Sequence, residues 1–370
     1  MERTIFVFDT LELGGAERQG LLLAKHLRER GSHVQIWGLT GEPGPLAALC
    51  DDAAIPWRAV RIDWGTRLVE AHINAFELRR LAAGLREQQP TLLMPYTFFS
   101  NVTTGLVWRL TGAHLCVWNQ RDAGFYLDGF NPWRSAAARL VPRFIANSQA
   151  GKDALVRAFA APDRVAVIHN GVDLAPPKLS RAEWRAKLGA RESTFVAAMV
   201  SNIHGNKDHV ELIAAWRHVV ARRPDSLLVL AGRKEETASD AEELVRGLRM
   251  TDHVRFTGHI DDVSGLWRAA DLCAHCSLTE GLPNAVLEAM ACGLPVVGTD
   301  IPGMREALGS DAVRYLVPRG GAQRLAELIT ELASDPDLRR RVGGGLQHRV
   351  QREFSAEAMC RATVDQLMAW

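Results

Sequence analysis

Short apolar runs alternate with amphipathic segments from one end of the chain to the other. The apolar runs lie at residues 4–10, 33–39, 91–96, 114–119, 143–148 and 165–170 in the first half, and at 195–201, 226–232, 253–258, 271–276, 294–299 and 312–317 in the second. Runs of this length between turns are typical of buried strands. The segments between them have helical periodicity, as in the helix predicted after the first run. Its apolar stripe ends before Gly31 and consists of Leu21, Leu22, Ala24 and Leu27.

This alternation of strands and helices predicts an α/β fold with parallel sheets that carry helices on both faces. A chain of 370 residues is long for one core, so we expect two domains. The turn Asn170-Gly171 and the stiff Pro176-Pro177 link mark the boundary, and Ser180 is placed to cap the next helix. We therefore predict two doubly wound, Rossmann-like domains, residues 1–172 and 173–354, that face a central cleft and hold a ligand at the carboxyl ends of their strands. The sequence allows the last helix, at about 355–370, to pack back on the first domain.

Composition and charge narrow the function. Hydrophobic residues make up 47% and charged residues 24% of the chain, as in an ordinary folded protein. Lys and Arg number 44 against 43 Asp and Glu, so the net charge of +1 gives no electrostatic reason to expect nucleic acid as a partner. The apolar run near the N-terminus is too short for a signal peptide or a membrane span, and we expect a cytoplasmic protein.

The six cysteines are scattered through apolar segments, which indicates reduced, buried thiols. Cys273-Ala-His-Cys276 has the spacing of metal ligands, but no second pair follows, and the segment is better interpreted as a core strand. Asp261-Asp262 indicates the start of a helix rather than a cation site. We expect no metal and no cofactor.

The stretch EGLPNAVLEAMACGLPVV, from Glu280 on, carries the main candidate chemistry. It follows a predicted strand and begins a helix, with Pro283 suited to the first turn. Backbone N–H groups over residues 281–285 and the positive end of the helix dipole predict an anion site that would suit a phosphate. Glu280 precedes these donors and Glu288 lies farther along, so both carboxylates are placed to accept hydrogen bonds from hydroxyls on either side of a diphosphate. The alternative is a helix cap and a solvated glutamate, but the apolar surroundings of Glu288 make an unpaired charge costly.

These residues resemble those of the retaining, nucleotide-sugar-dependent glycosyltransferases of family 4, which have the GT-B fold. The most specific element is the Glu-x7-Glu motif from Glu280 to Glu288. Supporting motifs follow in the family's order: GGAER (14–18), HNGVD (169–173), NKDH (206–209), LAGRK (230–234) and FTGHIDDV (256–263). The resemblance implies transfer of a hexose-type sugar, with retention and without metal, from a nucleotide diphosphate donor to a hydroxyl acceptor. Uridine is the base that the family leads us to expect, and guanosine stays open.

The resemblance also implies roles for individual residues. Glu288 would hold the donor ribose, Glu280 a hydroxyl of the transferred sugar, and Lys207 the diphosphate. Further donor contacts would come from Gly14, Gly15, Gly281, Leu282, Pro283 and Asn284.

Two positions depart from the family pattern. Asn202 stands where many relatives carry an arginine, with His204 or Arg233 as compensation. Arg121 and Asp122 occupy the region where relatives often have a histidine near the reacting carbon. We expect both to contact the acceptor as catalytic residues beside Glu280 and Lys207, and a structural Arg–Asp pair is an equal alternative.

The acceptor itself stays open among a polysaccharide or other glycan, a lipid-linked sugar and a small metabolite. Residues 131–144 mix basic and apolar side chains, which allows peripheral contact with the inner membrane face, although an ordinary amphipathic helix is favoured. Two other functions stay in view: a GT-B nucleotide-sugar 2-epimerase or hydrolase, and a non-catalytic nucleotide-sugar-binding protein. A nicotinamide-dependent dehydrogenase is disfavoured because Gly-x-Gly-x-x-Gly does not follow the first strand.

Overall fold

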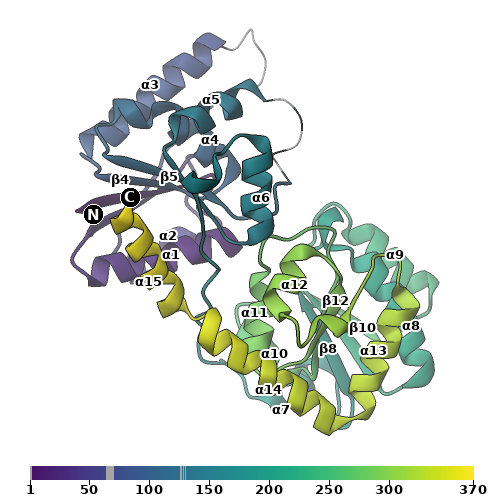
Figure 1. Ribbon diagram of the computed structural model, residues 1–370. Coiled ribbons are helices and arrows are strands. Elements are labelled where there is room, and N and C mark those ends of the chain that lie inside the picture. Colours follow the sequence, from purple (N-terminus) through teal and green to yellow (C-terminus); the bar gives the residue numbers. More distant parts are fainter. Residues whose placement is uncertain (1, 64–70, 126, 128, 130) are drawn as a thin grey trace. The chain divides into compact units, whose positions relative to one another are not determined.

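The computed structural model describes residues 2–63, 71–125, 127, 129 and 131–370 and divides into two compact units (Figure 1). The first runs to Gly171 and takes in Ala356–Trp370, and the second is Val172–Ser355. Each unit is a parallel sheet with helices, so the predicted pair of doubly wound, Rossmann-like α/β domains is confirmed.

The first unit contains a seven-stranded parallel sheet in the order β3-β2-β1-β4-β5-β6-β7. Its strands are β1 (Arg3–Phe8), β2 (His33–Gly38), β3 (Trp57–Ala59), β4 (Leu92–Pro95), β5 (Leu115–Gln120), β6 (Arg143–Ala146) and β7 (Val165–Val167). Its helices are α1 (Gly15–Glu29), α2 (Pro45–Asp52), α3 (Ala71–Glu87), α4 (Phe98–Val107), α5 (Pro132–Leu140), α6 (Gln149–Ala158) and α15 (Ala356–Ala369), with 3-10 turns η2 (Trp108–Leu110) and η3 (Pro162–Arg164).

Both faces of this sheet are buried, which is why its strands are apolar at nearly every position. In β1, Ile5 and Val7 belong to one hydrophobic cluster, whereas Phe6 and Phe8 belong to the cluster on the other face. Alternate side chains of one strand thus build two separate cores.

Helix α15 completes the second of these cores. Met359, Cys360 and Leu367 pack in the same cluster as Phe6 and Phe8. A Cβ added to Gly171 would lie 2.6 Å from the Cα of Ala356, so the absence of a side chain lets the chain ends of this unit meet. The side chain of Gln19 fixes the same glycine by one hydrogen bond to its carbonyl and one from its N–H, each 2.8 Å long.

The second unit contains a six-stranded parallel sheet in the order β10-β9-β8-β11-β12-β13. Its strands are β8 (Phe195–Val200), β9 (Ser226–Ala231), β10 (Val254–Gly258), β11 (Leu272–His275), β12 (Val296–Thr299) and β13 (Leu316–Val317). Its helices are α7 (Arg181–Leu188), α8 (His209–Arg222), α9 (Ala238–Gly247), α10 (Val263–Ala269), α11 (Asn284–Ala291), α12 (Pro302–Leu308), α13 (Ala322–Ser334) and α14 (Pro336–Glu353), with 3-10 turns η4 (Gly205–Lys207) and η5 (Val313–Tyr315).

The order of strands reverses once in each sheet, between β1 and β4 in the first unit and between β8 and β11 in the second. Successive connections leave on opposite faces at such a switch point, which leaves a crevice outside the carboxyl ends of the two central strands. This places candidate sites at the ends of β1 and β4 and of β8 and β11.

Several local predictions agree with the structure and others were wrong. Ser180 caps α7 and Asp262 caps α10, as expected. The predicted strand 312–317 is shorter, because the N–H of Tyr315 turns back to the carbonyl of Ala312 and only β13 remains at the sheet edge. Edge strands of this kind are often short. The sequence also missed the edge strand β3. Leu22, which was placed in the apolar stripe of α1, is only half-buried, whereas Leu23 is fully buried.

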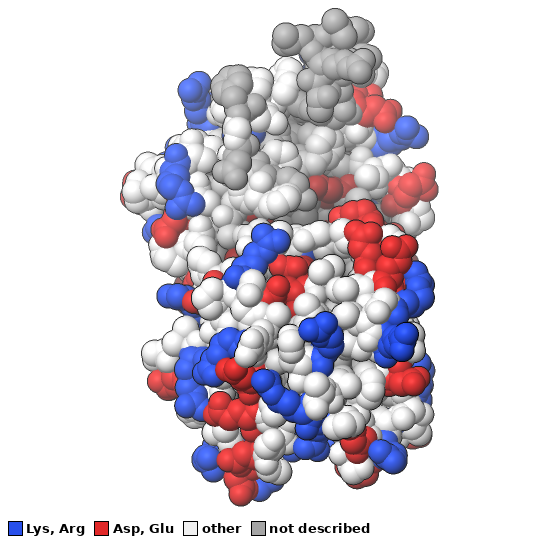
Figure 2. All heavy atoms as spheres, turned by 90° about the vertical axis from the view of Figure 1, so that its right-hand side faces the viewer, with Lys and Arg blue, Asp and Glu red and all other residues white. Residues whose placement is uncertain are grey.

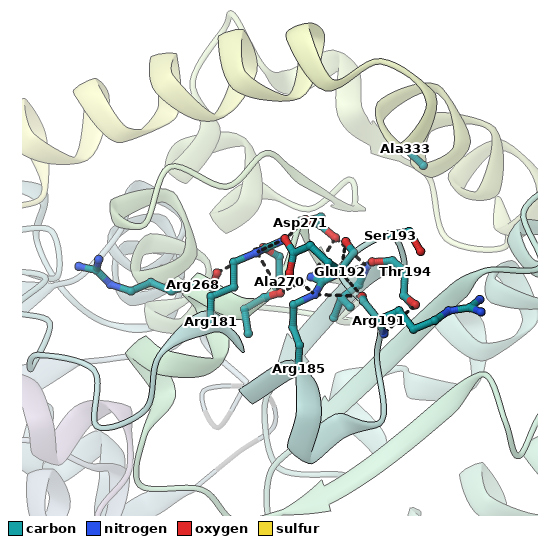
Figure 3. A network of polar contacts seen from close by, with 12 residues as sticks. Arg181, Arg185, Arg191, Glu192, Ser193, Thr194, Arg268, Ala270, Asp271 and Ala333 are labelled. Atoms are coloured by element: carbon teal, nitrogen blue, oxygen red, sulfur yellow. Dashed lines mark hydrogen bonds and ion pairs between the residues drawn. The ribbon is translucent and has the colours of Figure 1, made fainter. Parts of the chain in front are cut away.

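A buried arginine closes the amino edge of the second sheet (Figure 3). The side chain of Arg185, 2% exposed, donates to the carbonyls of Ala269 (2.8 Å) and Arg191 (3.1 Å). It lies 3.5 Å from the carboxylate of Asp271, and this carboxylate also accepts the N–H of Val196 at 2.9 Å. The network thereby joins α7 to the beginnings of β8 and β11.

The charges on the face drawn in Figure 2 are interspersed, with Lys and Arg beside Asp and Glu over much of the surface. Within the part of the chain that the structure describes, no helix combines the length and the apolar character that crossing a membrane requires.

Replacing Arg185 by methionine should lower the free energy of unfolding by about 3 kcal/mol, because several buried carbonyls each lose one donor and Asp271 loses one of its two arginine partners. The matched control is Arg191→Met, which removes an ion pair with Asp225 from a side chain that is 77% exposed. It should cost less than about 1 kcal/mol. Urea unfolding of both variants checks this, and equal losses would contradict the assigned role of Arg185.

Candidate functional site

Most of the predicted donor residues of the second unit lie in loops at the carboxyl ends of three adjacent strands. Asn202 and Lys207 follow β8, Arg233 follows β9, and Glu280 follows β11. Residues 281–283 lead from there into α11, which begins at Asn284. Pro283 precedes the helix instead of occupying its first turn, and its carbonyl accepts the N–H groups of residues 286 and 287.

The structure brings Lys207 and Glu280 into direct contact. Lys207 Nζ and Glu280 Oε1 form an ion pair, and the two side chains are 19% and 13% exposed. The ring Nε2 of His275, a residue that is 2% exposed, lies 3.1 Å from the same Oε1. One carboxylate oxygen is therefore shared by a lysine that follows β8 and a histidine at the end of β11.

This arrangement keeps Glu280 ionised. Burial alone would raise the pKa of its carboxyl group, but the positive charge of Lys207 and the hydrogen bond with His275 outweigh burial and lower the pKa to about 2. Burial also lowers the pKa of His275, which favours a neutral ring that donates Nε2–H to the carboxylate. The site thus presents a fixed anion beside a fixed cation at neutral pH.

The sequence did not predict His275 as a site residue. It appeared only inside the Cys-x-x-Cys spacing, which the structure shows as strand β11 with free, buried cysteines at 273 and 276. The available signal was its position as the last residue of that strand, because the carboxyl ends of parallel strands face the ligand crevice.

The loop of Lys207 is joined to the loop of Glu280 by further hydrogen bonds. The carbonyl of Asn206 accepts from the N–H of Leu278 (2.8 Å) and from Ser277 Oγ (2.9 Å). The side-chain amide of Asn206 donates to the carbonyl of Thr279 at 3.0 Å. These hydrogen bonds hold the backbone of the two loops together, so Lys207 and Glu280 are in place before any ligand binds.

The loop before α11 packs closely on the next helix. A Cβ at Gly303 would lie 2.2 Å from the carbonyl oxygen of Gly281, so only glycine at this position of α12 allows the approach. Residues Gly281, Leu282 and Pro283 are buried, and Glu288 is half-buried on α11. The two glutamates of the motif therefore lie on different elements, one in the loop and one inside the helix.

Asn202 holds two loops together. Its Nδ2 donates to Glu235 at 2.7 Å, and its Oδ1 accepts the N–H of Arg233 at 3.2 Å. The Arg233 side chain is exposed, whereas His204 accepts the N–H of Asn206 and so caps the turn before Lys207. Asn202, which stands where many relatives carry an arginine, thus helps to shape the loop that carries Arg233.

The first unit has a cavity of about 350 Å³ at its own switch point. It is lined by Asp9, Tyr96, Thr97, Phe98, Asn101, Asn119, Gln120, Arg121 and Asp122. Asp9 follows β1 and its carboxylate accepts the N–H of Ser100 and the hydroxyl of Thr97, each at 2.6 Å, at the start of α4. The sequence missed this residue, although an acid directly after the first strand was a usable signal. Burial raises the pKa of Asp9.

Arg121 and Asp122 have different partners in this cavity. Arg121 donates from Nη2 to Asn170 Oδ1 (2.6 Å) and lies over the ring of Tyr96, 5.3 Å from its centroid. Its Nε is buried and, within the described part of the chain, has no hydrogen-bond partner. Asp122 instead accepts the N–H groups of residues 124 (2.6 Å) and 125 (2.8 Å), which closes a turn.

Arg121 and Asp122 therefore have different interaction partners. They form no ion pair with each other among the described contacts. Burial lowers the pKa of Arg121 and raises that of Asp122. Arg121 contacts Asn170 and Tyr96, whereas Asp122 is engaged in the turn.

Gly14 and Gly15 lie at the beginning of α1. The N–H of Gly14 donates to Glu17 Oε2 at 3.1 Å, and an added Cβ at Gly14 would lie 2.6 Å from that oxygen. A larger residue at position 14 would therefore displace the end of the Glu17 side chain from the helix start. Burial raises the pKa of Glu17, and the nearby Asp9 adds to the effect.

Comparison with known protein families gives two matches that together cover most of the chain. The model of glycosyltransferase family 4 matches residues 13–176, and the model of the glycosyl transferases group 1 matches residues 180–346.

Individual relatives are similar over part of their length. D-inositol 3-phosphate glycosyltransferase of Streptomyces bingchenggensis is 30% identical over 236 residues, which are 60% of this chain and 52% of that protein. A GDP-mannose-dependent mannosyltransferase of Corynebacterium glutamicum is 31% identical over 218 residues, 55% of each chain. The chain thus spans about half the length of the curated relatives that it matches.

Among solved structures, HepE of Anabaena in complex with UDP and glucose superposes with a TM-score of 0.87 over all of both chains. The sequence identity is 22%, so this likeness concerns the fold. WaaG, a glycosyltransferase involved in lipopolysaccharide biosynthesis, has a TM-score of 0.72 and 18% identity over 97% of this chain and 98% of its own.

The lowered pKa of Glu280 predicts how its contribution to stability depends on pH. Since the pKa in the folded protein is about 2 and the ordinary value is 4.5, the ionised carboxylate stabilises the fold above pH 4.5, and this contribution is lost as the pH falls toward 2. The difference in free energy of unfolding between the protein and its Glu280→Gln variant should shrink by about 1 kcal/mol from pH 7 to about pH 3.5. Urea unfolding at both pH values checks this, and a difference that stays constant or grows would contradict the paired state of Glu280.

Proposed function

This chain belongs to glycosyltransferase family 4, and from that premise we propose that it transfers a hexose-type sugar from a nucleotide diphosphate donor to a hydroxyl acceptor. The observation that carries the proposal is the buried, ionised Glu280 held by Lys207 and His275 at the carboxyl end of β11. An anion and a cation fixed side by side match the two parts of a sugar diphosphate, which are hydroxyl donors and phosphate oxygens.

Lys207 can serve the donor without releasing Glu280. Its ammonium group has three N–H donors, of which the ion pair with Glu280 engages only part, so a phosphate oxygen can approach the same nitrogen. The free oxygen of the Glu280 carboxylate then accepts from a sugar hydroxyl. The neighbouring start of α11 adds the positive end of a helix dipole, which favours phosphate at this edge of the sheet.

The proposed reaction breaks the bond between the anomeric carbon and the diphosphate oxygen, and the bonding electrons leave with the diphosphate. The acceptor oxygen forms the new bond on the same face of the sugar, and its proton passes to the departing diphosphate. Lys207 stabilises the negative charge that develops there, and no metal is required in this scheme. Anomeric configuration is retained because entry and departure occur on one face.

The donor is proposed to be a UDP-sugar. The complex of HepE with UDP and glucose supports uridine, and the GDP-mannose-dependent relative makes guanosine the competing base. Glu288, half-buried on α11, is proposed to hold the ribose hydroxyls. Acceptor contact is assigned to Arg121, because this residue lines the cavity of the first unit. The acceptor class stays a glycan, a lipid-linked sugar or a small metabolite.

The two glutamates should respond differently to substitution. Glu288→Ala should raise the Kd for the nucleotide about 10-fold, because hydrogen bonds to a carboxylate are lost in the bound ground state. Glu280→Ala should lower turnover about 100-fold with a smaller effect on nucleotide binding, because its partner is the sugar that reacts. Calorimetry with UDP and with UDP-hexose, together with release of UDP in the presence of acceptor mixtures, measures both effects.

The exposed Glu243 provides a matched control, since Glu243→Ala removes the same charge from the surface of α9. Glu243→Ala should change neither the Kd for the nucleotide nor the turnover. If Glu280→Ala and Glu288→Ala behave like this control, the donor site is misplaced. Sugar release without any acceptor would instead indicate a hydrolase, and nucleotide binding without turnover would indicate a non-catalytic binding protein.

A further inference from the structure

The first unit has a second cavity, at the opposite edge of its sheet. The cavity has a volume of about 480 Å³, and its lining includes Leu115 and Arg143, the first residues of β5 and β6. The candidate acceptor cavity lies at the other end of the same strand, next to Gln120. A six-residue strand separates the two by roughly 20 Å, so the second cavity is not part of the transfer site.

Positive charge is concentrated in this second cavity. Its lining contains four arginines, Arg109, Arg139, Arg143 and Arg164, together with Trp108 and Trp370, and contains no Asp or Glu. None of the four arginines forms an ion pair with an acid that the structure describes, whereas arginines elsewhere, such as Arg305 with Asp300, do. In a chain whose net charge is only +1, this is a local excess of arginine that no described Asp or Glu side chain of the lining offsets.

One of the four arginines is structural. Arg164 donates to the backbone carbonyls of Ala138, Val141 and Pro142 at the end of α5, which fixes one wall of the cavity. The indole N–H of Trp108 donates to the carbonyl of Leu140 at 3.0 Å and fixes a second wall. The cavity is thus shaped by hydrogen bonds that involve two of its own lining residues.

The other three arginines are free to bind a ligand. Arg109 lies over the ring of Trp108 at 5.5 Å and Arg143 over that of Trp370 at 5.7 Å, measured from the guanidinium carbon to the ring centroid. Stacking orients a guanidinium but uses its face, so the N–H groups at its edge stay available for oxygen atoms. Arg139, in the last turn of α5, is exposed and has no hydrogen bond to another described residue.

We propose that this cavity binds a phosphate-bearing anion through Arg109, Arg139 and Arg143. Guanidinium forks match phosphate oxygens in pairs, and one phosphate carries enough charge and acceptor oxygens to engage more than one arginine. Leu110, 60% exposed, follows Arg109 and adds an apolar contact next to the charged group. The ligand is either a soluble phosphate ester or the headgroup of an anionic phospholipid at a membrane surface.

The test separates these two sources. One arm titrates the full chain, in the presence of UDP, with inorganic phosphate and with glycerol phosphate by calorimetry at low ionic strength. The other arm measures co-sedimentation with vesicles of phosphatidylglycerol and phosphatidylcholine, and with vesicles of phosphatidylcholine alone. Binding in the first arm identifies a site for soluble phosphates, and binding to the anionic vesicles alone identifies a headgroup site.

The variant Arg109→Gln/Arg139→Gln assigns the binding to this cavity and not to the donor site. Each arginine removed near an anionic group should weaken binding about 5-fold, and the double variant about 25-fold. The control is Arg58→Gln: Arg58 is exposed and lies over Trp37 at 5.4 Å, on the edge strand β3 at the other side of the sheet. It removes an equally stacked charge and should leave binding unchanged.

No binding in either arm would overturn the proposal, as would equal losses in the double variant and in Arg58→Gln, or equal binding to neutral and anionic vesicles. Neither arm depends on sugar transfer. Unchanged urea unfolding of the double variant verifies that the first unit, which contains both arginines, is intact.

Discussion

The ion pair between Lys207 and Glu280 is the interaction on which the proposed site depends. A carboxylate that is 13% exposed needs compensation, and it receives it from a lysine on one loop and a histidine at the end of a strand. These loops follow β8 and β11, the two strands that meet where the sheet order reverses. At the other end of the same strands, Arg185 and Asp271 join their beginnings (Figure 3). Charged groups therefore join the two central strands at both ends. The candidate site lies at the carboxyl ends, and the network around Arg185 connects the amino ends.

The carboxyl and amino edges of each sheet carry different kinds of charged residues. The carboxyl edges carry the charged residues of the candidate sites, with Glu280 and Lys207 in one unit and Asp9 and Arg121 in the other. The amino edges carry arginines, as a satisfied network around Arg185 and as an uncompensated cluster around Arg139 and Arg143. This division follows from the parallel arrangement, in which every strand delivers its last residue to the same edge.

The sequence predicted the fold well because strands buried on both faces are continuous apolar runs, as in β1 and β8. It was less accurate at two sheet edges, where it missed the three-residue strand β3 and extended β13 beyond its two residues. Glu280 and Lys207 could be selected as candidates, but their contact spans 73 positions and no local pattern contains it. His275 was recognised as a strand residue, yet only the three-dimensional structure shows that its ring faces Glu280. Likewise, the separate partners of Arg121 and Asp122, adjacent in sequence, depend on Asn170 and on a turn that the sequence does not reveal.

The most direct test of the central claim is a calorimetric titration of the purified protein with UDP, UDP-glucose, UDP-N-acetylglucosamine and GDP-mannose, with and without EDTA. The account predicts saturable binding of the uridine nucleotides that EDTA does not weaken and that Lys207→Ala weakens. Absence of binding by any of the four compounds, or binding that Lys207→Ala leaves unchanged, would contradict the placement of the donor site between Lys207 and Glu280.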